Sequence, residues 1–351
     1  MKRRIRLGVI GCGMVAHYHM KNLMTDDRVE LLWIAEISKK ALKTAGEEFA
    51  VPNATTDYKV MLEDPALDAV VVSTPPTTHA PIGIAVMRAG KHLMLEKPIA
   101  HTVSDARKLL RESEKHPHLT ITDCSCRHAR LNPKFRTIKK FIASGKIGRV
   151  YHIHYRSLQR QQRSGVEYHP SAKWFLNRAL SGGGPLNDFG VYPLSFHLGV
   201  VGEPTFISTE AFCIGRLDKV DPGTPIYDVE EHGGALMKFS SGLSMYWEIG
   251  YNAHSDDVDS TTIYGTTGGL QFAFGSWSGD NIKHFYIDNE GAGKPRYRTL
   301  KVSHKNHIDD TYQLDRAFID AIAKKKGAPM PFSLAVKNLE IIHQVYKAAD
   351  W

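Results

Sequence analysis

The stretch that decides the fold of this 351-residue chain is Ile5-Arg-Leu-Gly-Val-Ile10 followed directly by Gly11-Cys-Gly13-Met-Val-Ala16. The first part is a short apolar run typical of a β-strand, and the second has the G-x-G-x-x-A pattern of a dinucleotide-binding loop. In that pattern the first glycine makes a tight turn, the second lets a pyrophosphate approach the backbone, and the small third residue lets helix and strand pack closely. The pattern alone also fits an ordinary glycine turn, so the segments that follow must decide.

A second apolar run, Leu31-Leu-Trp-Ile-Ala35, ends in Glu36, about 20 residues after the loop, where an acid can hold the ribose 2′-hydroxyl. Its charge would repel a 2′-phosphate, so Glu36 favours NAD over NADP. Lys39 and Lys40 follow closely and leave NADP possible.

Strand-like and helix-like segments then alternate as far as residue 122. We expect helices at 38–49, 58–63, 79–89 and 104–115, and strands at 68–73, 92–95 and 119–122. Such alternation predicts an α/β domain with a doubly wound parallel sheet.

Ligands of such sheets bind outside the carboxyl ends of the strands, where Ser73-Thr-Pro-Pro76 and Glu96-Lys97-Pro98 leave the sheet. An ammonium group held there could hydrogen-bond a substrate hydroxyl and favour loss of its proton. The alternative is that Lys97 pairs with a cofactor phosphate or with a surface acid.

A second glycine-rich stretch, Gly182-Gly-Gly-Pro-Leu-Asn-Asp188-Phe-Gly-Val-Tyr192, contains three consecutive glycines. These do not suit the interior of a regular element, but they allow backbone to approach a ligand or another element closely. Asp188 and Tyr192 are four residues apart, so we expect them on one face of the helix that follows. A carboxylate and a phenol presented together are candidates to line an active site.

The rest of the second half is rich in expected strands, at 150–156, 235–239, 243–249, 261–264, 270–274 and 297–302, with helices at 131–144, 309–323 and 333–349. A long polar and aromatic loop spans residues 159–174, and its mixture of side chains suits a sugar, although a solvated surface loop is the alternative. Its candidate substrate-binding residues are Arg160, Arg163, Tyr168 and Trp174, and Arg127 and His128 are candidates to reach the same cleft.

Composition excludes several classes of protein. The net charge of +8 has no stripe of basic and aromatic residues beside it, which argues against nucleic-acid binding. No apolar run approaches the roughly 20 residues of a membrane span. The four cysteines show no disulfide or zinc spacing. The eighteen histidines show ligand spacing with a carboxylate partner only in scattered cases such as His152/His154, so we expect a cytoplasmic protein without a catalytic metal.

Taken together, the motifs resemble the glucose–fructose oxidoreductase, inositol dehydrogenase and rhizopine-catabolism family (Gfo/Idh/MocA). The matching segments are Gly11-Cys-Gly13-Met-Val-Ala16, Thr74-Pro-Pro-Thr-Thr-His79, Glu96-Lys97-Pro98, Gly182-Gly-Gly-x-Leu-x-Asp188-x-Gly190 and Ile263-Tyr-Gly-Thr-Thr-Gly-Gly-Leu270. The resemblance implies a Rossmann domain over residues 1–124 and an α+β domain over 125–351, with an open, largely antiparallel sheet whose face commonly forms homodimers or homotetramers. The final helices would be able to pack back on the Rossmann domain.

The resemblance also implies which residues contact the dinucleotide. These are Gly11, Cys12, Gly13, Met14, Val15, Glu36, Ser73, Thr74, Pro75, His79, Glu96 and Lys97.

The chain departs from the family at one motif. Where the family usually has D-x-G-x-H-x-x-D, the histidine is Tyr192 and the second aspartate is Ser195. A histidine base needs an acceptor on its second ring nitrogen, whereas a phenol does not, so the two changes fit together. Tyrosine has an ordinary pKa of about 10, so Lys97 or the positive nicotinamide must lower it for Tyr192 to act as a base. The tyrosine form is similar to the glucose–fructose oxidoreductase and dihydrodiol dehydrogenase branches.

We therefore expect an NAD(H)-dependent oxidoreductase that acts on a secondary alcohol of a sugar, polyol or sugar-like ring. Lys97, Asp188 and Tyr192 are the expected catalytic residues. One alternative is oxidation of a glycoside 3-hydroxyl with retained cofactor. The other is a dinucleotide-sensing regulator, such as the galactose-regulon repressor of the same family, which has no need of the lysine and the phenol.

Overall fold

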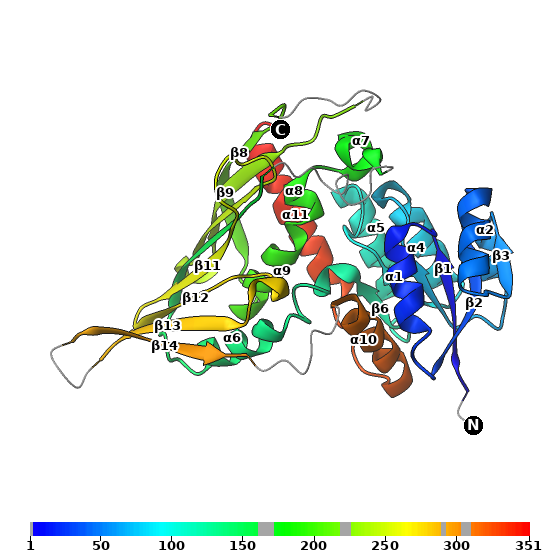
Figure 1. Ribbon diagram of the computed structural model, residues 1–351, viewed down its shortest axis with the longest axis horizontal. Coiled ribbons are helices and arrows are strands. Elements are labelled where there is room, and N and C mark those ends of the chain that lie inside the picture. The colour runs from blue at the N-terminus through cyan, green and yellow to red at the C-terminus, as the bar shows by residue number, and fades with distance from the viewer. Residues whose placement is uncertain (1–2, 161–171, 218–225, 289–292, 303–309) are drawn as a thin grey trace. The chain divides into compact units, whose positions relative to one another are not determined.

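The computed structural model describes residues 3–160, 172–217, 226–288, 293–302 and 310–351 (Figure 1). The chain divides into two compact units. The N-terminal unit comprises Met1–Arg127 and Ile308–Leu339, and the C-terminal unit comprises His128–His307 and Glu340–Trp351.

The described part of the N-terminal unit contains a six-stranded parallel sheet in the order β3-β2-β1-β4-β5-β6. Its strands are β1 (Ile5–Ile10), β2 (Val29–Ala35), β3 (Asn53–Thr55), β4 (Ala69–Val72), β5 (His92–Leu95) and β6 (Ile121–Asp123). The strand order reverses between β1 and β4, which is the switch point where doubly wound sheets bind ligands. The predicted parallel sheet is confirmed.

Helices and short turns make up the rest of the regular structure in this unit. They are α1 (Met14–Leu23), α2 (Lys39–Glu48), α3 (Tyr58–Leu62), α4 (His79–Arg88), α5 (Val103–Glu114), α10 (Asp310–Lys324), the first part of α11 (Phe332–Ala348), and the short 3-10 turns η1 (Pro76–Thr78) and η2 (Cys124–Cys126). Local sequence explains their starts, since the side chains of Ser38 and Thr102 accept the backbone N–H groups of Ala41 and Asp105. The late helix α10 packs against α1, so a segment from late in the chain completes the first unit.

The described part of the C-terminal unit contains an eight-stranded sheet in the order β14-β13-β12-β11-β7-β10-β9-β8. β7 and β10 pair in parallel, and the other neighbours are antiparallel. The strands are β7 (Val150–Leu158), β8 (Phe206–Ile214), β9 (His232–Phe239), β10 (Ser244–Gly250), β11 (Val258–Gly265), β12 (Gly268–Phe272), β13 (Asn281–Ile287) and β14 (Pro295–Lys301). This agrees with the expected open, largely antiparallel sheet. β8 and β13 were not predicted.

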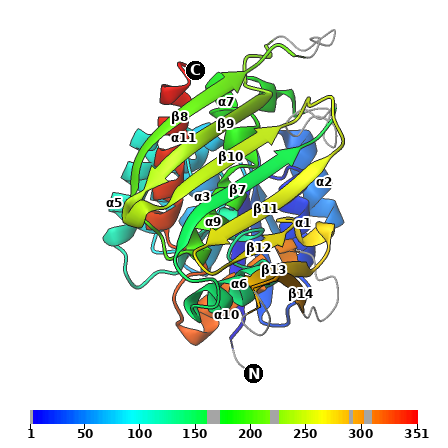
Figure 2. The same cartoon turned by 90° about the vertical axis from the view of Figure 1, so that its left-hand side faces the viewer.

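Helices cover one face of this sheet. They are α6 (Pro133–Ala143), α8 (Pro185–Asp188), α9 (Val191–Val200) and the end of α11, while η3 (Lys173–Leu176), α7 (Arg178–Ser181), η4 (Ser240–Gly242) and η5 (Ser276–Ser278) lie in connections. Tyr155, Phe196, Phe239 and Trp247 are fully buried in the core beneath them. Figure 2 looks onto the other face, where the strands lie bare of this unit's described helices.

In the described residues of both units, every helix is too short or too polar to cross a lipid bilayer.

Candidate active site

The two glycines of the loop between β1 and α1 differ in what surrounds them. Gly11 has a φ of +86°, and a Cβ there would lie 2.7 Å from the carbonyl oxygen of Ser73. Gly13, directly before α1, has open space where its Cβ would be. An added side chain would fill this cradle at the helix N-terminus, which is where a phosphate group binds.

Glu36 leaves the end of β2 and reaches the glycine loop. Its carboxylate accepts the backbone N–H of Cys12 at 2.8 Å and that of Ser38 at 2.9 Å. Burial, together with the Glu36 charge, raises the pKa of the Cys12 thiol to about 12, so the thiol is neutral. The predicted juxtaposition of the acid and the loop is thus present in the N-terminal unit.

Two polar residues after β4, Ser73 and His79, are buried in different hydrogen-bonding environments. The Ser73 hydroxyl is buried and has no hydrogen-bond partner among the residues that the structure describes. His79 is fully buried, with its ring nitrogens 2.7 and 2.8 Å from the carbonyl oxygens of Thr74 and Pro98. Burial lowers the pKa of His79, and a neutral ring has a single N–H, so it donates to only one of these two carbonyl oxygens at a time. Pro75 precedes η1, which starts α4.

Lys97 follows Glu96 directly at the end of β5, and the Lys97–Pro98 peptide bond is cis. The Lys97 backbone N–H donates to the Glu96 carboxylate at 2.9 Å, and the Glu96 side chain is buried. Lys97 therefore leaves the sheet at the carboxyl edge, as the sequence predicts.

In the C-terminal unit, packing explains the three consecutive glycines. Gly182 ends α7 in the left-handed conformation, with a φ of +85°. A Cβ at Gly183 would overlap the Tyr346 hydroxyl, and one at Gly184 would overlap the carbonyl oxygen of Glu230. The glycines are therefore required because three segments meet here at backbone contact distance.

The Glu230 carboxylate anchors the start of α8. This fully buried group accepts the backbone N–H of Gly184 at 2.8 Å, that of Leu186 at 3.0 Å and the Tyr346 hydroxyl at 2.7 Å. Burial raises the pKa of Glu230 and these hydrogen bonds oppose the rise. Sequence reasoning missed both anchoring residues, because nothing in their local sequence marks them.

Asp188 and Tyr192 do not share one helix, so that prediction is wrong. Asp188 ends α8 and Tyr192 lies in the first turn of α9, with a break at Phe189 and Gly190. The break follows from packing, since a Cβ at Gly190 would overlap the Leu186 carbonyl and the Trp247 ring. Both side chains are nevertheless buried in the same short stretch.

Aromatic rings surround the Tyr192 phenol within the C-terminal unit. The ring of His128 meets Tyr192 edge-on at 4.7 Å between centroids, and Phe189 does so at 5.9 Å. Trp277 contacts His128 at 5.4 Å and is 57% exposed. The predicted His128 therefore lies beside Tyr192. Trp277 was missed because it lies far along the chain in a glycine- and serine-rich connection.

The other candidate substrate-binding residues are more scattered. The Arg160 backbone N–H donates to Asp257 at 3.3 Å, and Trp174 stacks on Phe175 at 3.9 Å. Arg127 lies in the N-terminal unit, where its guanidinium donates to Glu96 at 3.2 Å. Arg163 and Tyr168 lie outside the described residues.

A methyl group at Gly184 is expected to destabilise the C-terminal unit. Gly184→Ala would drive a Cβ into the Glu230 backbone, which cannot move aside as a flexible side chain could, and overpacking of this kind costs about 1–3 kcal/mol or more. Thermal unfolding should show a lowered midpoint. Gly327→Ala is the matched control, since its Cβ would meet nothing within 4 Å. Equal midpoints for the two variants would contradict this account of the glycines.

Two family models match successive parts of the chain. Residues 5–123 match the model described as the oxidoreductase family with an NAD-binding Rossmann fold. Residues 135–271 match the GFO/IDH/MocA C-terminal domain.

Two individual relatives share 27% and 26% sequence identity with this chain. A levoglucosan dehydrogenase of Pseudarthrobacter phenanthrenivorans is 27% identical over 257 residues, which is 69% of this chain but only 64% of the relative, less than two thirds of its length. A D-glucoside 3-dehydrogenase of Escherichia coli K12 is 26% identical over 364 aligned positions, covering 99% of this chain and 95% of the relative.

Solved structures show the same fold. A levoglucosan dehydrogenase in complex with NADH and levoglucosan superimposes with a TM-score of 0.84 at 21% identity, covering 99% of this chain and 98% of that one. The two family models together span most of the chain and lie on its two units in order. The chain therefore belongs to the GFO/IDH/MocA family of oxidoreductases with an NAD-binding Rossmann fold.

Proposed function

We propose that the protein is an NAD-dependent dehydrogenase that interconverts a secondary alcohol and a ketone on a sugar, a polyol or a similar ring. The observation that carries the proposal is the set of polar groups at the switch point of a Rossmann sheet: the open Gly13 cradle, the Glu36 carboxylate, the unused Ser73 hydroxyl and Lys97 at the strand exit. Relatives named as sugar and inositol dehydrogenases support the substrate class.

The residues of the N-terminal unit fit a dinucleotide. The backbone of Gly11–Val15 would receive the pyrophosphate, Glu36 the ribose hydroxyls, and the Ser73 hydroxyl a polar group near the switch point. In this proposal Thr74, Pro75, His79 and Glu96 complete the cofactor site. When bound, the dinucleotide supplies the hydride acceptor or donor.

The chain's own residues would move the proton and orient the substrate. We assign exchange of the hydroxyl proton to Tyr192, whose phenol lies among aromatic rings in the C-terminal unit. The Lys97 ammonium would donate a hydrogen bond to the reacting oxygen and favour loss of the proton from Tyr192. Asp188 would position Lys97 or a neighbouring substrate hydroxyl. His128, Trp277, Arg160 and Trp174 would contact the rest of the sugar.

A narrower candidate is oxidation of a glycoside at its 3-hydroxyl with the cofactor retained between half-reactions. The match to a D-glucoside 3-dehydrogenase along 99% of this chain favours the 3-hydroxyl as the reacting group, and retention of the cofactor is an added part of this candidate. Protein purified without added nucleotide would then contain reduced cofactor, visible by its absorbance.

A substrate screen tests the proposed activity. Purified protein with NAD⁺ or NADH is offered aldoses, glycosides, inositols and keto-sugars, and absorbance of the reduced nicotinamide is followed. Turnover of at least one of these compounds is expected. Tight dinucleotide binding without turnover of any of them would instead support the regulator.

Cofactor choice should depend on the Glu36 charge. We expect wild-type protein to bind NADH more tightly than NADPH by about 10- to 100-fold, because the carboxylate repels a 2′-phosphate a few ångströms away. Glu36→Gln keeps an oxygen for the Cys12 N–H and should lose most of this preference, whereas Glu47→Gln, on the exposed side of α2, should retain it. Fluorescence titration measures the ratio. Equal affinities in the wild-type protein would contradict the assignment.

We propose that the bare face of the C-terminal sheet joins two copies of the chain, as a dimer or as part of a tetramer. Large apolar side chains are exposed on this face, and burying them against a second copy would remove them from water. They are Phe212, Ile214, Leu236, Tyr264, Phe285, Ile287 and Tyr297. Analytical ultracentrifugation should find an oligomer that Leu236→Asp with Phe285→Asp dissociates. A monomeric wild-type protein would contradict this.

A further inference from the structure

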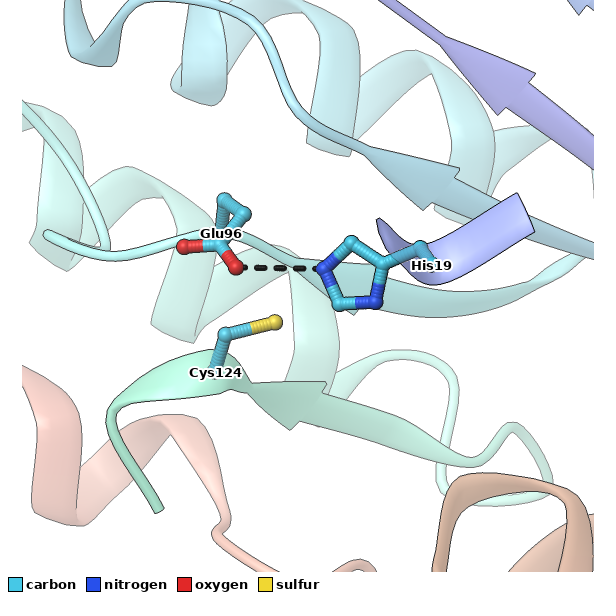
Figure 3. Close-up of side chains that lie close together, drawn as sticks. All are labelled: His19, Glu96 and Cys124. Carbon is cyan, nitrogen blue, oxygen red and sulfur yellow. Dashed lines mark hydrogen bonds and ion pairs between the residues drawn. The ribbon is translucent and has the colours of Figure 1, made fainter. Parts of the chain in front are cut away.

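A buried ionic cluster lies at the carboxyl end of β5, immediately before Lys97 (Figure 3). Its centre is His19 of α1, whose side chain is fully buried. The ring Nδ1 lies 2.6 Å from Asp315 Oδ1 of α10, and Nε2 lies 3.1 Å from Glu96 Oε1. Since carboxylates only accept hydrogen bonds, a ring that donates to both must carry two protons and a positive charge.

The electrostatics of the cluster agree with a charged ring. Burial alone would lower the pKa of His19, but the charges and hydrogen bonds of Asp315 and Glu96 outweigh it and raise that pKa to about 9. Burial would raise the pKa of Glu96, but Arg127, His19 and Lys97 hold it well below its usual range. His19 is therefore a cation and Glu96 an anion at neutral pH.

Glu96 connects this cation to the lysine segment. One oxygen of its carboxylate, Oε1, accepts from His19 at 3.1 Å and from Arg127 at 3.2 Å. The other oxygen accepts the backbone N–H of Lys97 at 2.9 Å. A rotation of the carboxylate that satisfied a different donor would break the bond to Lys97. The two cations thus hold the carboxylate in the one orientation that fixes the start of the Lys97 segment.

The positive charge of the Lys97 ammonium group interacts with the carboxyl groups of Glu96 and Asp123. Its charge contributes to the low pKa of Glu96, and it opposes the burial that raises the pKa of Asp123 to about 6. Loss of the His19 charge is therefore expected to change the electrostatic environment of the Lys97 ammonium through Glu96.

A metal ion is the competing explanation. His19, Glu96 and Cys124 each offer a ligand atom, and the three atoms lie within 4.8 Å of one another. A metal needs a free ring nitrogen and a thiolate. Here both ring nitrogens face carboxylates, Arg127 contacts Glu96, and burial raises the pKa of Cys124 far above its usual value. The contacts favour an ion-pair cluster over a metal site.

We propose that His19 is a positioning residue for Lys97: its imidazolium, held by Asp315, fixes the Glu96 carboxylate and thereby the direction and the charge environment of the lysine. This rests on the proposed function, in which the Lys97 ammonium polarises the reacting oxygen. The charged groups that face the cluster are Asp315 from α10, Arg127 and Asp123 from the end of β6 and η2, and Glu96 and Lys97 from the end of β5.

The test is the pH dependence of kcat/KM in the full-length His19→Gln variant with the substrate found by screening. Gln is neutral and still offers a donor toward Glu96. We expect kcat to fall about 10-fold or more through misplacement of Lys97, with KM nearly unchanged. In the wild-type protein the alkaline limb reports loss of a proton from His19 or from Lys97. In the variant it should move to higher pH, because the titrating ring is gone and removing a cation favours protonation of the lysine.

Further variants separate the possible outcomes. The double variant His19→Gln with Asp315→Asn leaves no unpaired buried acid, so we expect it to fold even if the single variant does not. Its alkaline limb of kcat/KM should also move to higher pH, but by less than in the single variant. His197→Gln changes another fully buried histidine, which bonds to the Thr261 hydroxyl, and should leave the limb in place.

An alkaline limb that stays in place or moves down in both His19 variants would overturn the proposal, and so would stoichiometric zinc that His19→Gln loses. If Lys97→Met keeps full turnover, the proposed function fails instead.

Discussion

Lys97→Met is expected to lower kcat/KM by about 10²–10⁴-fold, the usual effect of removing a group that assists proton transfer. Methionine has a similar length and no charge, so the loss reports the ammonium rather than the volume of the side chain. Tyr192→Phe should reduce turnover by a similar factor, since it removes only the hydroxyl. Steady-state kinetics with saturating cofactor measure both.

Matched controls make this result specific. Lys108→Met removes an exposed lysine of α5 that pairs with Asp105 at 2.7 Å, and it should leave turnover unchanged. Dinucleotide affinity of Lys97→Met should stay within a few-fold of wild type, because backbone groups and Glu36 supply most of the proposed contacts. Near-full turnover of Lys97→Met with cofactor bound would refute the assigned role.

The stability of the N-terminal unit is expected to fall on the alkaline side of neutrality because of His19. A histidine whose folded pKa is raised from 6.5 to about 9 stabilises the fold fully below pH 6.5, and this contribution is lost as the pH rises through 9. The full contribution is on the order of 3 kcal/mol. Hydrogen exchange of the β4 and β5 peptides, corrected for intrinsic rates, should show this loss in the wild-type protein and much less of it in His19→Gln.

In the C-terminal unit, the contribution of His197 to stability has the opposite pH dependence. Burial lowers its pKa to about 3, so its neutral ring stabilises the fold above pH 6.5, and that contribution is lost as the pH falls toward 3. Hydrogen exchange of the α9 peptides, corrected for intrinsic rates, should therefore become faster as the pH falls below 6.5 and should not change on the alkaline side. The same alkaline response in wild type and in His19→Gln would contradict the charged-ring cluster.

Local patterns were sufficient to predict the N-terminal sheet apart from the short strand β3. The glycine loop, the apolar runs and the position of Glu36 all act over short sequence distances, and in the structure the Glu36 carboxylate accepts the Cys12 N–H of the glycine loop. The Ser38 cap is equally local, since its side chain bonds to an N–H three residues later.

The contacts that position the candidate catalytic residues are not local. His19 and Asp315 are 296 residues apart, and Glu230 is 46 residues from the Gly184 N–H that it holds. The break between α8 and α9 arises because the Trp247 ring leaves no room for a side chain at Gly190, and no periodicity in the stretch itself signals this. Such features depend on which elements the tertiary fold brings together.

β8 and β13 were missed for a related reason. The side chains of these strands alternate between the core and an exposed face that carries apolar residues such as Phe212 and Phe285, so the polar–apolar alternation of a half-buried strand is blurred.

The most direct test of the account is a crystal structure of the protein with NADH and a sugar identified by the screen. It predicts that the Lys97 ammonium and the Tyr192 hydroxyl both lie about 2.6–3.2 Å from one oxygen of the sugar, whose carbon faces the nicotinamide. A structure in which either group lies out of hydrogen-bonding reach of that oxygen, with sugar and cofactor both bound, would contradict it.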